Sequence, residues 1–137
     1  MGVVMTAKYN GQLHCEALHQ PSGNTLDTDA PVDNQGRGLA FSPTDLLGAS
    51  LLTCAITTLA IKAPKLGINL DKMSGHVEKQ MTKDGPRRVE SLQVQIQIDD
   101  HVQADQRDAL EDIAKNCPVA LSLHPNIKIP ISFSYLD

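Results

Sequence analysis

The sequence predicts one α+β domain in which mostly antiparallel strands pack around a buried central helix. Three observations lead to this prediction. Several segments alternate apolar and polar residues, which is the period of a half-buried strand. The stretch LLTCAITTLAIK, residues 51–62, is apolar on nearly every side, as in a helix without a solvent face. The chain has 137 residues, of which 41% are hydrophobic and 20% charged, which is typical of one globular domain.

The first strands are expected within residues 1–29. In GQLHCEALHQ, the residues Leu13, Cys15 and Ala17 alternate with polar ones, and the turn signal PSGN follows. Residues 25–28 are then expected to return as a third short strand. The next segment, APVDNQGRGLA, is rich in turn-forming residues and is predicted to be a loop.

A long helix is predicted over residues 43–63. Ser42 is suited to cap its first turn, Pro43 fits the first helical position, and Asp45 stands where a capping box places its acid. Pro64 ends the helix. Because the helix is apolar all round and one small sheet covers about half of it, a partner subunit is expected to cover the rest.

The second half of the chain predicts a hairpin, two short helices and a last strand. The hairpin spans residues 73–99, where SLQVQIQID alternates cleanly after an Asp-Gly-Pro turn. The helices span residues 104–123 and are interrupted where Pro118 follows Cys117, because the residue before a proline avoids the α region. The last strand spans residues 127–135 and contains a proline, which indicates an edge position.

The charge of the chain argues against nucleic-acid binding. The formal net charge is -4, and the one dense basic patch, residues 83–88, is broken by a turn. Nucleic-acid binding needs clustered Lys and Arg.

The apolar run 46–61 is shorter than the roughly 20 residues that cross a bilayer, and no basic segment precedes an apolar stretch at the N-terminus. A cytoplasmic protein without a nucleic-acid or membrane partner is expected.

The three cysteines, an odd number, indicate reduced thiols rather than a disulfide framework. Cys15 lies on the apolar side of a strand and is expected to behave as a small buried hydrophobe. Cys117 begins a helix, where unpaired N–H groups lower the pKa of a thiol, although it could equally complete the apolar face of the preceding helix. Cys54 lies deep in its helix with no charged residue within four positions, so local sequence favours core filling.

Other motifs of catalysis or metal binding are weak or missing from the sequence. There is no C-x-x-C, and His124 follows Cys117 at a spacing too long for the usual pairs of zinc ligands. The sequence has no G-x-S-x-G, G-x-G-x-x-G or P-loop, so no metal or cofactor is expected. A cysteine–histidine pair for acyl transfer stays open as a hypothesis, because such partners meet only in the folded chain.

Two segments that contain cysteines carry a family resemblance. SPTDLLGASLLTCAITTLAIK, followed later by KNCPVALSL, resembles the OsmC/Ohr superfamily, the osmotically inducible protein C and organic hydroperoxide resistance proteins. The resemblance extends from about Phe41 to the C-terminus and includes the order of the elements. It implies an OsmC-like fold, with antiparallel sheets packed on the central helix, and an intertwined homodimer with its sites at the subunit interface.

The resemblance also implies a dithiol peroxidase acting in oxidative-stress defence. Cys54 would be the peroxidatic residue, which attacks an organic hydroperoxide and becomes a sulfenic acid. Cys117 would be the resolving residue, which condenses with that sulfenic acid to a disulfide. A dithiol reductant would then reopen the disulfide.

A buried thiol needs a nearby cation, because burial by itself raises the pKa of a thiol. In the organic-hydroperoxide branch, the resemblance implies an arginine from the N-terminal strands, held by a glutamate directly after the helix-opening proline. Here Thr44 stands at that position, Asp45 is one place further on, and Arg37 is the first arginine. Arg37, Asp45 and Thr44 are therefore the possible activating residues. The alternative function is a non-catalytic homodimer that binds a small apolar ligand or senses redox state.

Overall fold

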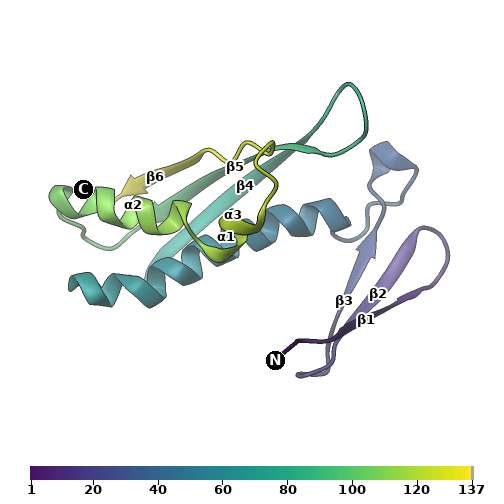
Figure 1. Ribbon diagram of the computed structural model, residues 1–137, viewed down its shortest axis with the longest axis horizontal. Coiled ribbons are helices and arrows are strands. Elements are labelled where there is room, and N and C mark those ends of the chain that lie inside the picture. Colours follow the sequence, from purple (N-terminus) through teal and green to yellow (C-terminus); the bar gives the residue numbers. More distant parts are fainter. Residues whose placement is uncertain (137) are drawn as a thin grey trace. The chain divides into compact units, whose positions relative to one another are not determined.

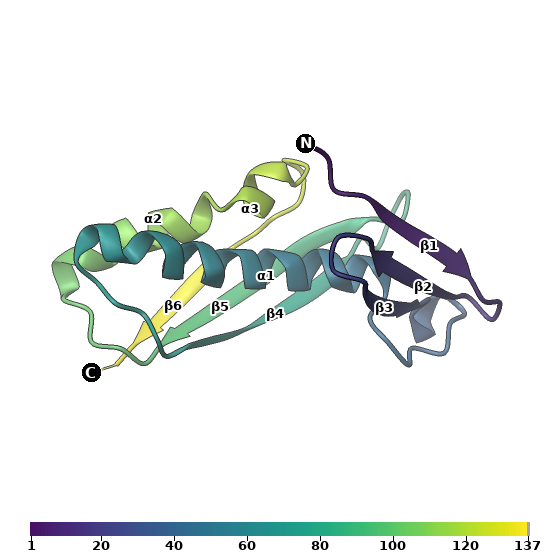
Figure 2. The ribbon, with the colours of Figure 1, turned by 90° about the horizontal axis from the view of Figure 1, so that it is seen from below.

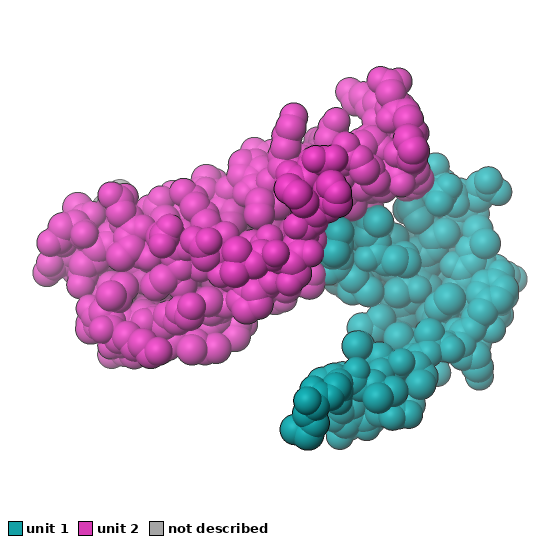
Figure 3. All heavy atoms as spheres, viewed as in Figure 1, with its two compact units in different colours: residues 1–47 teal, residues 48–137 magenta. Residues whose placement is uncertain are grey.

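The computed structural model describes residues 1–136 and divides into two compact units, Met1–Leu47 and Gly48–Asp137 (Figure 3). The first unit contains three strands and a loop, and the second contains a second sheet and helices. This mixture of helices and two small, separate sheets confirms the predicted α+β class.

The first unit is an antiparallel meander of β1 (Met5–Tyr9), β2 (His14–His19) and β3 (Asn24–Asp29) in the order β1-β2-β3. The tight connection before β2 uses left-handed backbone at Gly11, and Gly23 does the same before β3. A loop with the short 3-10 helix η1 (Val32–Asn34) then leads to the start of α1 (Pro43–Lys62).

The two faces of this meander differ in chemistry. The register pairs Ala7 with Ala17 and Ala17 with Leu26, so these residues share one apolar face. Lys8 and Glu16 pair on the opposite, charged face. Large apolar side chains of this unit stay exposed in the single chain, namely Val3, Val4, Met5, Tyr9, Leu13, Leu26, Val32, Leu39 and Phe41.

The second unit places helices on one face of a three-stranded sheet. The strands are β4 (Met73–Met81), β5 (Val89–Ile98) and β6 (Ile131–Tyr135), in that order. Helices α1 and α2 (Arg107–Lys115) lie on the same side of the sheet (Figures 1 and 2). The remaining helical segments are η2 (Ala63–Leu66), η3 (Ala104–Gln106) and α3 (Pro118–Ser122).

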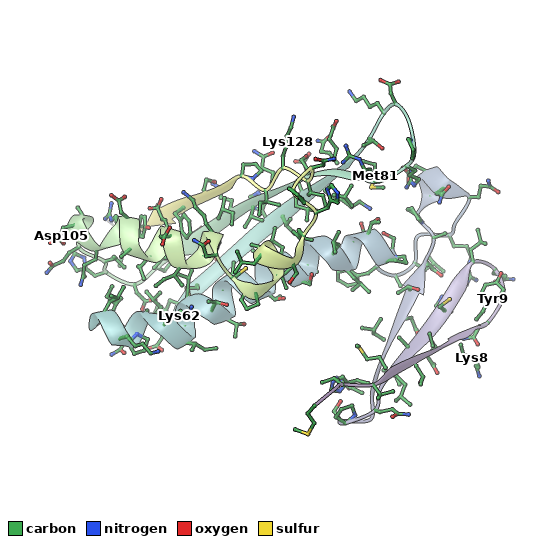
Figure 4. The ribbon with its side chains drawn as sticks, viewed as in Figure 1. Lys8, Tyr9, Lys62, Met81, Asp105 and Lys128 are labelled. Carbon is green, nitrogen blue, oxygen red and sulfur yellow. The ribbon has the colours of Figure 1, made fainter. Side chains whose placement is uncertain are left out.

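The last strand differs from the sequence prediction in direction and length. Antiparallel sheets were predicted, but β6 pairs parallel with β5, with Val94 opposite Ile131. The helices between the two strands provide the long crossover that a parallel pair requires. The strand begins at Ile131 rather than at residue 127, and Lys128 makes only an isolated bridge to Ser91 before Pro130, which has no N–H to donate. Lys128 therefore lies toward the end of the sheet where the β4–β5 hairpin turns (Figure 4).

Helix α1 rests on the sheet along one stripe, in which Leu51, Ala55 and Leu59 are fully buried. Two glycines let the helix approach closely. A Cβ on Gly48 would lie 3.3 Å from the Leu92 side chain, and a Cβ on Gly75 would lie 2.6 Å from a backbone oxygen of β5. The helix is not buried on all sides in the single chain, because its other face is partly or fully exposed, as at Thr53 and Ile61.

By length and composition alone, the segment Pro43–Leu66 is also apolar enough to cross a membrane, although the sequence prediction rated the apolar run as too short. Core helices of globular proteins meet the same criterion, and the buried stripe on the sheet is the reason this helix is apolar on that side.

Candidate functional site

Cys54 projects from the middle of α1 and is half-buried. Its sulfur lies 3.8 Å from the hydroxyl oxygen of Thr58, one turn further along the helix. Helix geometry explains this neighbour, because side chains four residues apart share a face. The only recorded polar partner of Cys54 on its own helix is thus a neutral hydroxyl, and this hydroxyl is itself mostly buried.

Cys117 stands at the N-cap of α3 and is fully buried, with 0% exposure. Pro118 follows it in the first helical position, so the chain turns sharply there between α2 and α3. The carbonyl of Cys117 accepts the N–H of Leu121, and its own N–H reaches the carbonyl of Ala114. The backbone therefore holds the thiol in one place at the junction of two helices.

Burial raises the pKa of the Cys117 thiol above its ordinary value. The N–H groups of Val119 and Ala120 act in the opposite direction, although neither makes a regular capping hydrogen bond with the sulfur. The pKa is raised further by a hydrogen bond and a charge interaction with Cys54. The sequence suggestion that the helix N-terminus gives Cys117 a low pKa is therefore wrong, because desolvation is the larger effect.

The proximity of Cys54 and Cys117 is the central feature of the site. The two thiols come from different helices of the second unit and lie close enough for Cys54 to raise the pKa of Cys117. Burial and the neighbouring Cys54 thiol both favour the protonated form of Cys117. This is a dithiol arrangement in which one sulfur is half-exposed and its neighbour is buried and neutral.

The third thiol, Cys15, belongs to the first unit. It lies on β2 opposite Tyr9 and Thr28, on the apolar face of the meander, and is half-buried. The predicted structural role is consistent with this position. All three cysteines are free thiols in the structure.

The three possible activating residues also belong to the first unit, and each has a recorded partner there. Asp45 accepts the backbone N–H of Ser42 at 3.0 Å, while Ser42 caps the helix in return, which makes the predicted capping box. The Thr44 hydroxyl lies 3.3 Å from that of Ser42. The Arg37 guanidinium lies 4.0 Å from Asp29.

Asp29 and His14 are the side chains that sequence analysis missed. Asp29 ends β3 and is only 1% exposed, and its carboxylate lies 2.6 Å from Nδ1 of His14 on β2. The two residues are directly opposite in the strand register. Pairing the second predicted strand with the third, and extending the third to residue 29, places these two residues opposite each other.

Two other site hypotheses receive no support from the described residues. Residues 1–136 contain no group of three or more His, Cys, Asp or Glu side chains that could hold a metal ion. The recorded partners of His14, His19 and His124 are Asp29, Ser22 and the backbone of Asn126, so these histidines are not paired with thiols as acyl transfer requires.

Comparison with known proteins identifies the family. Residues 36–132 match the model of the family described as OsmC-like protein, so the chain belongs to this family and the resemblance is confirmed. It is similar to the crystal structure of a candidate osmotic stress induced and detoxification response protein from Psychrobacter arcticus 273-4, with 38% identity, 98% of each chain covered and a TM-score of 0.90. No curated protein sequence matches the chain.

Two more distant structures share the fold. One is an organic hydroperoxide resistance protein OsmC from Legionella pneumophila, with 20% identity, a TM-score of 0.79 and coverage of 98% of this chain and 97% of the other. The other is an organic hydroperoxide resistance protein from Elizabethkingia anophelis, with 15% identity, a TM-score of 0.79 and coverage of 98% and 96%. The OsmC-like fold predicted from the cysteine segments is therefore confirmed.

Proposed function

We propose that this protein reduces organic hydroperoxides through a dithiol cycle, with Cys54 as the peroxidatic residue and Cys117 as the resolving residue. The proximity of these two thiols, which raises the pKa of Cys117, is the single observation that carries the proposal. Membership of the OsmC-like family supports it, and so do the names of structural relatives that are called organic hydroperoxide resistance proteins.

The cycle has three balanced steps. The Cys54 thiolate attacks the terminal oxygen of the hydroperoxide, an S–O bond forms, the O–O bond breaks, and the alkoxide leaves and takes a proton to become an alcohol. Cys117 then loses its proton and attacks the sulfur of the sulfenic acid, so that an S–S bond forms and water leaves. A dithiol reductant exchanges with the disulfide and is itself oxidised.

The different burial of the two thiols fits the peroxidatic role of Cys54 and the resolving role of Cys117. A peroxidatic sulfur must be reached by substrate, and Cys54 is half-exposed whereas Cys117 is fully buried. A resolving thiol should stay protonated until the sulfenic acid forms, and both burial and the charge interaction with Cys54 favour this state. Apolar residues of α1 around Cys54 favour an organic rather than a small polar peroxide.

We propose Arg37 as the cation that favours the Cys54 thiolate, in the same chain or in a partner subunit. It is the first arginine in the sequence, and its side chain is 46% exposed in the single chain. Asp45 is an anion that caps the helix, and Thr44 is uncharged, so neither can be this cation. The three free thiols support a reducing compartment, which we propose is the cytoplasm.

A homodimer is part of the proposal. The exposed face of α1 and the exposed apolar residues of the first unit both lack cover in the single chain. An exposed apolar surface of this extent is typical of an interaction site. A second copy of the chain would bury it.

The first experiment counts free thiols under denaturing conditions before and after one equivalent of cumene hydroperoxide. The three free thiols should fall to one in the wild type, because Cys54 and Cys117 become a disulfide and Cys15 remains. Cys54→Ser should abolish the loss, and the matched control Cys15→Ser should still lose two thiols. If all the wild-type thiols persist, the peroxidase is rejected, and the non-catalytic homodimer that binds a small apolar ligand is preferred.

A further inference from the structure

Asp29 is a buried carboxylate whose polar contacts join β2 to the loop after β3. Oδ2 accepts the backbone N–H of Leu39 at 2.9 Å, and Oδ1 lies 2.6 Å from Nδ1 of His14. Because a carboxylate only accepts hydrogen bonds, Nδ1 of His14 carries the hydrogen. The backbone N–H of Asp29 also bonds the carbonyl of Phe41. One side chain therefore connects β2, the end of β3 and the far end of the loop.

A buried charge is costly unless it is paired and hydrogen-bonded. Here the hydrogen bond from His14 is the main cause that lowers the pKa of Asp29 below its usual 3.8, and burial only partly opposes it. The N–H of Leu39 and the charge of Arg37 act in the same direction as His14. The carboxylate is thus ionised at neutral pH. The loop helps to stabilise this buried charge, because it provides the N–H of Leu39 and the guanidinium of Arg37.

The loop itself has little freedom. The N–H groups of Gly36 and Gly38 bond the carbonyls of Pro31 and Ala30. A Cβ on Gly36 would overlap the backbone of Ala30, and Gly38 has a left-handed φ of +64°. Arg37 stands between these two glycines, so its backbone is held from both sides.

The charged neighbours of the Asp29–His14 pair all lie on the same face of the meander. Nε2 of His14 is 3.8 Å from the Asp27 carboxylate, so a protonated imidazole would lie between two acids. Glu16 pairs with Asp27 on one side and with Lys8 on the other. Arg37 is the one cation recorded in contact with Asp29 besides His14 in residues 1–136.

The resemblance assigns the task of holding the arginine to a glutamate directly after the helix-opening proline, and this chain has Thr44 there. We propose that Asp29, supported by His14, is the positioning residue that replaces this glutamate and holds the loop of Arg37 in its active conformation. This inference rests on the proposed peroxidase function. Asp29 and His14 act through Arg37 and do not touch the substrate.

The test combines peroxide kinetics with a local probe of the loop. Asp29→Asn should slow oxidation of Cys54 by cumene hydroperoxide by about tenfold, because small displacements of activating groups have effects of this order. If Asp29 acts through Arg37, the double variant Asp29→Asn/Arg37→Ala should be no slower than Arg37→Ala alone. Multiplicative losses in the double variant would overturn the proposal.

Trypsin cleaves after arginine, so the rate of cleavage after Arg37 reports on the loop without any peroxide. Asp29→Asn should increase this rate severalfold, while cleavage after Arg88 in the second unit stays unchanged as an internal control. The matched variant Asp105→Asn, at an exposed acid of the second unit, should behave as wild type in both assays. An unchanged cleavage rate in Asp29→Asn overturns the proposal.

The two proposals can fail separately. If the wild type does not lose thiols with peroxide, the peroxidase fails, and with it the catalytic purpose of Asp29, whatever the cleavage rates. If the wild type is active but Asp29→Asn is unchanged in rate, only the positioning role fails. Should Asp29→Asn not fold, His14→Ala removes the same hydrogen bond from a half-buried residue, and the same two outcomes decide.

Discussion

At the scale of single residues, the two halves of the site show how burial and a helix end compete for one thiol. Cys117 meets the N–H groups of α3, which favour a thiolate, but it is fully buried beside a second sulfur. Desolvation is the larger effect, so the pKa of Cys117 is raised and its proton is retained. The buried residue is therefore suited to resolve and not to attack.

The raised pKa of Cys117 predicts a loss of stability at alkaline pH. In the unfolded chain the thiol has its ordinary pKa of 9.0, whereas in the folded chain its pKa is raised and it keeps its proton to higher pH. Above about pH 9 the folded state therefore binds more protons, and the free energy of unfolding falls as pH rises. Urea denaturation of the reduced protein between pH 7 and pH 10.5 measures this slope.

The matched variant for this measurement is Cys117→Ser, which keeps the shape of the side chain and does not titrate in this range. Its stability should fall less steeply above pH 9 than that of the wild type, whatever its stability at pH 7. If the stability of the two proteins fell equally steeply with pH, burial would not raise the pKa of Cys117.

At the scale of elements, β5 is the strand on which the second unit is built. Its side chains alternate between the core and solvent, with Leu92, Val94, Ile96 and Ile98 fully buried under the helices. It pairs with β4 on one side and β6 on the other, so it has no free edge. Substitutions at neighbouring residues of this strand should therefore lower the free energy of unfolding by very different amounts.

Ile96→Ala should destabilise the protein by about 2–5 kcal/mol, because it removes a fully buried side chain and leaves a cavity. Gln95→Ala, one residue earlier on the exposed face, should change the free energy of unfolding by no more than about 0.5 kcal/mol. Urea denaturation of the two variants beside the wild type makes the comparison. Similar losses in both would contradict the assigned faces of β5.

At the scale of the whole molecule, exposed apolar surface is the property that the single chain does not explain. The first meander has an apolar face that includes Met5, Tyr9 and Leu26, all exposed, and α1 has exposed residues such as Ile61. Surface of this kind favours association. The central helix is apolar on every side, although the sheet covers only one stripe of it. Association through the exposed side of the helix would explain why that side is also apolar.

The protein should therefore sediment as a dimer, at about twice the chain mass of 14.8 kDa, at micromolar concentration. Ala17→Glu places a charge on the apolar face of the meander and should dissociate the dimer. Lys8→Glu, on the opposite face of the same sheet, should leave it intact. A wild type that sediments at 14.8 kDa throughout this range would rule out the dimer.

Features that depend on neighbouring residues could be predicted from the sequence. Alternation predicted β5, and the Ser42, Pro43 and Asp45 pattern predicted the start of α1 with its capping box. The spacing of the two cysteine segments identified the family. Each of these features is a pattern of residues that are close together in the sequence, so it can be recognised without knowledge of the fold.

Features that depend on residues far apart in the chain could be found only in the folded protein. It brought Cys54 and Cys117 together, set the parallel direction of β6, and paired Asp29 with His14 and Arg37. In each case the deciding quantity is burial or a long-range contact. The pKa of Cys117 shows the reason, because its local sequence favours a thiolate while the surrounding helices exclude the water that a charge requires.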